Sequence, residues 1–172
     1  MTHDGFTHES AHNQSQEWYT PPSLFRALGV SFDLDPCSPG AEVVPWIPAT
    51  RHLTTRDNGL AAPWAGSVWM NPPYGTNTPR WMRRFIEHRC GIALVFSRTD
   101  VAWFHDLAVR ADALCFLRGR LWFVRADAGG RRGSGAGAGS MLVACGDAFV
   151  AALERLETAG LGKVWRLIGA VR

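Results

Sequence analysis

The spacing of apolar side chains predicts short helices and strands in alternation from about residue 20 onward. Helical segments repeat apolar residues every three or four positions, whereas strand segments alternate apolar and polar residues or run apolar without a break. On this basis helices are predicted over residues 20–29, 79–90, 100–111 and 147–160, and strands over 30–36, 68–70, 92–97, 113–117, 120–124, 140–145 and 163–171. Residues 37–66 show no clear period, apart from a short strand near 51–55.

The order of these elements predicts an α/β fold. Helix and strand alternate from residue 67 to about 110, and strands cluster afterwards. We therefore expect a Rossmann-like sheet that is mostly parallel and gains antiparallel strands late in the chain. Ligands of such sheets bind beyond the carboxyl ends of the strands. FDLDPCS at 32–38 and VWMNPPYG at 68–75 both place polar residues at such an end, so we expect the site there.

Length and composition suit one compact catalytic unit. With 172 residues, of which 47% are hydrophobic, the chain can form a single domain over 16–172 behind a polar, disordered tail at 1–15. No apolar run is long enough to cross a membrane, and the N-terminus lacks a signal-peptide pattern. The four cysteines form no CxxC pair, which predicts reduced thiols in a cytoplasmic protein, the host cytosol if a phage encodes it, and no metal site.

The charge of the chain leaves two interpretations open. Eighteen basic residues, all but one of them arginine, stand against 15 acidic residues and give a net charge of +3. Arginine forks suit phosphate oxygens, but a chain rich in Ala, Gly and Arg also shows such an excess through compositional bias. The stretch GGRRGSGAGAGS at 129–140 lacks the lysine of a P-loop and precedes a strand, so we expect a flexible hairpin loop. Its Arg131 and Arg132 could touch a nucleic-acid backbone.

The motif Asn71-Pro72-Pro73-Tyr74 carries the most specific chemistry. An exocyclic amino group on adenine is a poor nucleophile because its lone pair is delocalised into the ring. Two hydrogen-bond acceptors at fixed separation can make this nitrogen more tetrahedral, and we expect the Asn71 side chain and the Pro72 carbonyl to supply them. Consecutive prolines stiffen the turn, and Tyr74 offers a flat face on which a flipped base can stack.

Six segments together make the chain similar to the phage-type DNA N-6-adenine methyltransferases, the Dam family. They are EWYTPP at 17–22, FDLDPCS at 32–38, RDNGLAAPW at 56–64, NPPYG at 71–75, SRTDVAWFHDL at 97–107 and LRGRLWF at 117–123. The resemblance implies S-adenosylmethionine as cofactor, double-stranded DNA as partner, and a class I methyltransferase sheet. Only about 35 residues separate Asp35 from Asn71, so we expect that sheet to be shortened.

The resemblance also implies roles for individual residues. The residues it places at the cofactor are Trp18, Thr20, Pro21, Asp35, Pro36, Cys37, Asp57 and Asn71. Trp18 is equally well interpreted as a core residue, and Asp57 could face either the ribose or the adenine of the cofactor. The residues expected at DNA are Tyr74, Arg98, Arg118, Arg120, Arg131 and Arg132, with Arg118 and Arg120 also interpretable as exposed bystanders.

The leading hypothesis is therefore site-specific methyl transfer to the N6 amino group of adenine in DNA. Two alternatives stay open. A methyltransferase acting on a glutamine amide or on RNA needs the same pair of acceptors, and a catalytically silent DNA-binding module could keep the same fold. An oligomer is compatible with the sequence, although nothing in the pattern indicates one.

Overall fold

A single seven-stranded sheet organises the chain in a computed structural model that describes residues 19–124 and 132–167, with the backbone alone for 132–135. The predicted tail at 1–15 lies outside these ranges. The strand order is β2-β1-β3-β4-β8-β5-β9. The strands are β1 (Phe32–Asp35), β2 (Ala49–His52), β3 (Val68–Met70), β4 (Gly91–Phe96), β5 (Ala113–Leu117), β8 (Ser140–Cys145) and β9 (Gly162–Arg166), and a separate two-stranded ladder consists of β6 (Trp122–Val124) and β7 (Arg132–Gly135).

The strand directions confirm the predicted mixture. Strand β1 pairs in parallel with β2 and β3, and β3 pairs in parallel with β4. Strand β8 is antiparallel to both β4 and β5, and β9 is antiparallel to β5. Strands β1 to β5 therefore share one direction, and only the late strands β8 and β9 oppose it. The sheet is also short at its first edge, because β2 is the only regular element between β1 and β3.

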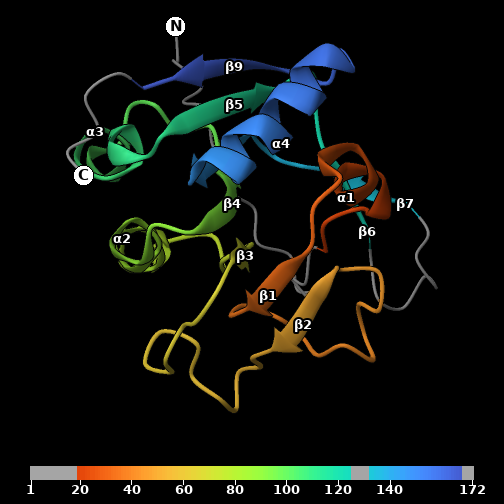
Figure 1. The fold of residues 1–172 in the computed structure, drawn as a ribbon, viewed down its shortest axis with the longest axis vertical. Coiled ribbons are helices and arrows are strands. Elements are labelled where there is room, and N and C mark those ends of the chain that lie inside the picture. Colours follow the sequence, from red (N-terminus) through yellow and green to blue (C-terminus); the bar gives the residue numbers. More distant parts are fainter. Residues whose placement is uncertain (1–18, 125–131, 168–172) are drawn as a thin grey trace, which may run out of the picture.

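Helices cover both faces of the sheet. Figure 1 shows α1 (Pro22–Leu28) and α4 (Asp147–Thr158) on one side, and α2 (Thr78–His88) and α3 (Ala102–Asp106) on the other. In β3 the central Trp69 packs into the core on the α1 side, whereas Val68 and Met70 pack on the α2 side. Burial on both faces explains why β3 and β4 are apolar without alternation.

Three predicted elements differ from the sequence expectation. The helix predicted over 100–111 divides into α3 and a short 3-10 turn, η1 (Ala108–Arg110), because Leu107 leaves helical geometry at φ −124° and ψ −57°. Its N-cap is Val101 and not Asp100. The strand predicted at 120–124 pairs outside the main sheet, and residues 132–135 of the presumed loop form its partner strand β7.

The described helices also bear on membrane insertion. Within residues 19–124 and 132–167, none of the helices combines the length and the apolar character that spanning a membrane requires.

Gly91 allows β3 and β4 to lie at their observed separation, and this generates a stability prediction. Gly91 has φ +137°, and a Cβ there would overlap the backbone of Val68 on β3. Gly160 has φ +71° but open space around the position of its Cβ. Substitution of Gly160 by Ala therefore adds only backbone strain, roughly 1–2 kcal/mol, whereas Gly91→Ala also forces the two strands apart.

We expect Gly91→Ala to lower the free energy of unfolding, measured by urea titration, by clearly more than Gly160→Ala does. Equal losses for the two variants would show that the close approach at Val68 costs nothing.

Candidate active site

The carboxyl ends of β1, β3 and β4 meet at one edge of the sheet because these strands are parallel neighbours. Asp35 is the last residue of β1, Asn71 follows β3, and Ser97 follows β4. The amide of Ser97 donates to the carbonyl of Gly139 (2.8 Å), so the start of β8 is tied to the same edge. The structure thus brings together the two polar segments that the sequence placed at strand ends.

A bulge in β1 sets the direction of Asp35. The amides of Asp33 and Leu34 both donate to the carbonyl of Ser67, at 2.9 and 3.0 Å. Two residues of β1 therefore face a single residue just before the neighbouring strand β3. As a result Phe32 packs in the core on the α1 side while Leu34 packs on the α2 side, although the two residues are two positions apart. The shifted alternation turns Asp35 toward the α1 side. The Asp33 carboxylate holds the bulge by accepting from the Ser67 amide (2.7 Å) and hydroxyl (2.8 Å).

The Asp35 carboxyl is buried and has few polar contacts that would stabilise its charged form. Its exposed fraction is 2%, and burial raises the pKa of its carboxyl to about 7, against the opposing effect of a hydrogen bond from the Cys37 amide (3.0 Å). His52 at the end of β2 places Nδ1 3.9 Å from Asp35 Oδ2 and 2.8 Å from the Ser38 hydroxyl. Burial and the nearby Asp35 charge raise the pKa of the Cys37 thiol well above its ordinary value, so this thiol stays protonated. Pro36 is buried between the two.

The residues of the Asn-Pro-Pro-Tyr motif are joined by a hydrogen bond within the motif. The Tyr74 hydroxyl donates to Asn71 Oδ1 at 2.9 Å, and both side chains are half-buried. Burial raises the pKa of Tyr74 well above its ordinary value, so the hydroxyl keeps its proton to donate. Pro72 is buried and Pro73 is exposed. A carboxamide oxygen has two lone pairs and can accept two hydrogen bonds.

Two phenylalanines that the sequence did not single out surround the Tyr74 ring. Phe96, at the end of β4, stacks on it with ring centroids 3.9 Å apart and planes 20° apart. Phe123 of β6 meets it edge-on at 6.3 Å. Phe96 covers one face of Tyr74, so at most one face is left for a base. The sequence could have indicated Phe96 by its place at the carboxyl end of β4, but only the structure shows that its ring reaches Tyr74.

The segment before α1 is fixed at the same side of the sheet. Tyr19 exchanges backbone hydrogen bonds with Val124 of β6 (3.1 and 2.8 Å), and Trp46 Nε1 donates to the Thr20 carbonyl at 2.9 Å. Thr20 is fully buried, and among the described residues its hydroxyl has no hydrogen-bond partner. Pro21 beside it is half-buried and precedes the first turn of α1.

Asp57 has a structural role in its own turn. Its Oδ2 accepts from the Thr54 amide (2.7 Å) and hydroxyl (2.8 Å), and these bonds lower the pKa of the exposed carboxyl. The turn lies against the segment after β1, since a Cβ at Gly59 would overlap the carbonyl of Pro36. Asp57 therefore belongs to a loop packed on the Asp35 region, with one carboxylate oxygen already committed.

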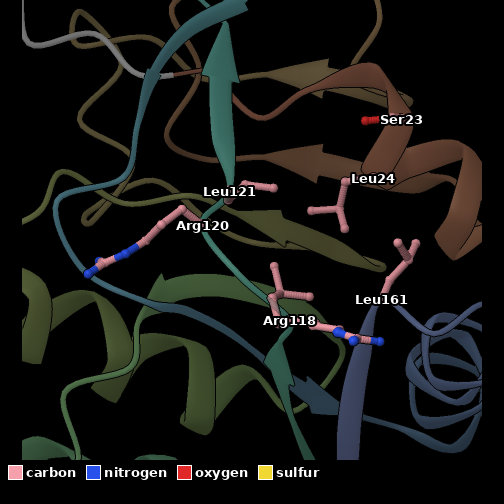
Figure 2. A pocket seen from close by; sticks show the side chains of 7 residues that line it. Ser23, Leu24, Arg118, Arg120, Leu121 and Leu161 are labelled. Carbon is pink, nitrogen blue, oxygen red and sulfur yellow. The ribbon is translucent and has the colours of Figure 1, made fainter.

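The arginines expected at DNA are distributed along the same edge. Arg98 follows β4, while Arg118 and Arg120 follow β5, and all three are exposed. A pocket of about 210 Å³ lies beside the latter two and is lined by Ser23, Leu24, Leu117, Arg118, Arg120, Leu121 and Leu161. In Figure 2 Leu24, Leu121 and Leu161 converge on this pocket, whereas Arg120 extends away from it.

Three predicted site residues cannot be placed in full. Trp18 and Arg131 lie outside the described residues, and Arg132 is described only as backbone in β7. Within the described ranges, no group of three His, Cys, Asp or Glu side chains gathers as metal ligands.

Comparison with known proteins identifies the family. The model of the family DNA N-6-adenine-methyltransferase (Dam) matches residues 7–153 of the chain. No match was found among curated proteins or among solved structures. The matched range covers most of the chain and includes both strand ends that form the site. The chain therefore belongs to the Dam family of DNA N-6-adenine methyltransferases.

Proposed function

We propose that this chain transfers a methyl group from S-adenosylmethionine to the N6 amino group of adenine at specific sites in double-stranded DNA. The observation that carries the proposal is the Asn71 carboxamide at the carboxyl end of β3, oriented by the Tyr74 hydroxyl at 2.9 Å. The family match supports the reaction, and the geometry supports the roles of the residues.

The residues on the α1 side of the edge fit the cofactor. The buried Thr20 hydroxyl lacks a partner among the described residues, and a methionine ammonium or carboxylate group could supply one. Asp35 is a carboxyl whose ionised form is penalised by burial, and a ligand cation would stabilise that form. S-adenosylmethionine, when bound, supplies a methyl group made electrophilic by its sulfonium. We assign its binding to Thr20, Pro21, Asp35, Pro36 and Cys37, with Trp18 and Asp57 as further candidates.

Asn71 and Pro72 prepare the amino group of the target base. In this proposal Asn71 Oδ1 accepts one amino proton, and the carbonyl of Pro72 accepts the other. With both protons held, the nitrogen lone pair leaves the plane of the ring and points toward the methyl group. No strong base is needed, because the nitrogen releases a proton readily once it has gained the methyl group. Pro73 stiffens the turn in which both acceptors stand.

Tyr74 has two roles in this proposal. Its hydroxyl holds the carboxamide so that the oxygen faces the base, and its ring supports the base itself. Since Phe96 stacks on one face of Tyr74, the base must use the other face or the edge toward Phe123. Stacking on an aromatic ring is worth roughly 1–3 kcal/mol per base, comparable to the few kcal/mol that flipping costs.

DNA binds across the same edge of the sheet. Arg98, Arg118 and Arg120 are exposed there, and Arg132 begins β7. Arg131, which precedes Arg132 in the sequence, is a further candidate. Arginine forks suit phosphate oxygens. Binding of this kind weakens with added salt.

The first test is methylation by the purified protein with labelled S-adenosylmethionine and a mixture of DNA, RNA and protein substrates, followed by analysis of the modified nucleosides. We expect N6-methyladenine from duplex DNA. Asn71→Ala should lower its formation at least about 100-fold, the scale of losing a preorganised polar group at a reacting centre, while cofactor affinity changes little.

Other outcomes assign other functions. Methylation of RNA or of glutamine would favour the alternative substrates, and DNA binding without methylation would indicate a silent module. Wild-type turnover in Asn71→Ala would refute the two-acceptor mechanism.

The two roles of Tyr74 can be separated by comparing Tyr74→Phe with Tyr74→Ala. Tyr74→Phe keeps the ring and loses one hydrogen bond, so we expect a rate loss of roughly 2- to 10-fold on all substrates. Tyr74→Ala also loses the ring, and we expect a larger loss on paired adenine than on mismatched adenine, because a mismatch lowers the cost of flipping.

Single-turnover rates on matched and mismatched duplexes measure both effects. If Tyr74→Ala lowers the methylation rate equally on the two duplexes, the Tyr74 ring does not support the flipped base.

Asp35 predicts a pH dependence of cofactor binding. Its pKa of about 7 in the folded protein means that the carboxyl is protonated below this pH and charged above it. A cationic cofactor favours the charged form, so affinity should rise from pH 6 to pH 8, by less than tenfold per pH unit. Calorimetric titration with S-adenosylmethionine measures it, and Asp35→Asn should give a flat profile.

Unfolding without ligand provides the control. Because the folded-state pKa of Asp35 is raised above its ordinary value, the contribution of Asp35 to stability is fully present below about pH 4 and is lost as pH rises through 7, and Asp35→Asn should remove this part of the pH dependence. A wild-type affinity independent of pH would exclude Asp35 from the cofactor site.

A further inference from the structure

The chain from the end of β5 to the start of β6 presents three large exposed side chains near the candidate site. Arg118, Arg120 and Trp122 are exposed, whereas Leu121 is half-buried and Phe123 is buried. Gly119 has φ +75°, so the chain bends between the two arginines before β6 begins at Trp122. Trp122 is 44% exposed, and so large an apolar surface at the edge of a site requires an explanation.

The backbone under Trp122 is held firmly. The carbonyl of Leu121 accepts from the Ala136 amide at 2.9 Å, and Val124 exchanges two hydrogen bonds with Tyr19. Trp122 pairs with Gly135 of β7, a residue that adds no side chain beside the ring. The indole is thus carried by a fixed strand and not by a free loop.

Trp122 is the sequence neighbour of a residue that contacts Tyr74. Phe123 meets the Tyr74 ring at 6.3 Å and is buried, whereas Trp122 is exposed. Adjacent residues of a strand point to opposite faces, so the indole lies on the solvent side of the strand whose inner side carries Phe123.

The two arginines before Trp122 suit a DNA strand. Within the described residues neither forms a salt bridge, and no acidic residue lines the pocket beside them. They flank the bend at Gly119, which has φ +75°. Figure 2 shows that the inner side of this segment is apolar, with Leu121 directed toward Leu24 and Leu161. Arg118 extends toward the end of β9 that carries Leu161, and Arg120 extends away from the pocket, where its Nη1 donates to the Ala136 carbonyl at 3.4 Å.

We propose that Trp122 is a wedge that enters the duplex where the target adenine leaves it, while Arg118 and Arg120 hold phosphates of the same DNA. The ring stacks on the bases exposed by flipping and so replaces the stacking that the adenine gave up. A large, rigid ring on a fixed strand suits this role, since little side-chain freedom is lost on insertion. The inference rests on the proposed function and adds to it the residue that opens the duplex.

The test uses a duplex in which 2-aminopurine replaces the adenine that the wild-type protein methylates. The fluorescence of this base rises when it leaves the stack. With the full chain and S-adenosylhomocysteine we expect a severalfold rise for wild type and little rise for Trp122→Ala. Trp122→Phe, which keeps a stacking ring, should recover much of the signal.

Methylation rates supply a second readout. Trp122→Ala should slow methylation of the matched duplex about tenfold or more and that of single-stranded DNA less than twofold, because a single strand needs no wedge. The matched control is Trp165→Ala, since Trp165 is 50% exposed on β9, the far edge strand of the sheet. It should behave as wild type in both assays.

Several results would overturn the wedge. Two of them are a wild-type fluorescence rise in Trp122→Ala and equal rate losses on duplex and single-stranded DNA. A third is a change in the sedimentation of Trp122→Ala without DNA while the fluorescence rise stays intact, which would assign the Trp122 ring to contacts between copies of the chain. Methylation of duplex adenine by wild type without any fluorescence rise would also end it. If wild type forms no N6-methyladenine at all, the proposed function itself fails, and the wedge with it.

Discussion

The candidate site depends on the parallel alignment of three short strands that end together. Strands β1, β3 and β4 are neighbours with one direction, so Asp35, Asn71 and Ser97 reach the same edge. Helices cover both faces of β3, and its three residues are fully enclosed. A strand buried on both sides cannot shift its register without exposing apolar surface, and this fixes where the polar turn begins. The position of the Asn71 amide is thus set by the packing of β3.

Within that constraint, aromatic packing orients the polar groups. Tyr74 is held between Phe96 and Phe123, which come from different parts of the chain, and its hydroxyl donates to Asn71. The bulge at Asp33 and Leu34 has a similar effect on Asp35, which it turns toward the α1 side. Both groups are therefore directed by their surroundings and not by flexible loops, as preorganisation of a reacting site requires.

Sequence patterns predicted most helices and strands, but they predicted poorly which of these elements contact one another. The helix at 20–29 and its Gly29 end, the apolar strands and the end of β3 before Asn71 all follow from local spacing and stiff residues. The pairing of Phe96 and Phe123 with Tyr74 could not be predicted, because it depends on which strands become neighbours. The break at Leu107 and the separate β6–β7 ladder were missed for the same reason, since tertiary packing overrides a local period there. Asp57 is a different case. The sequence placed this carboxylate at the cofactor, but only the structure shows that its Oδ2 accepts a hydrogen bond from the Thr54 hydroxyl.

The place of β8 has a consequence for how the chain assembles. This strand joins β4 on one side and β5 on the other, yet it begins only at Ser140. Until it is in place, the strands on either side form two unconnected pieces, each with an open edge of unpaired amides and carbonyls. The sheet can therefore be completed only after β8, which is made late in synthesis. Its pairing with β4 and β5 closes long loops, and such contacts form slowly. Nascent chains that stop before Ser140 lack both β8 and β9, so they leave β4 with an unpaired edge and β5 without any partner strand.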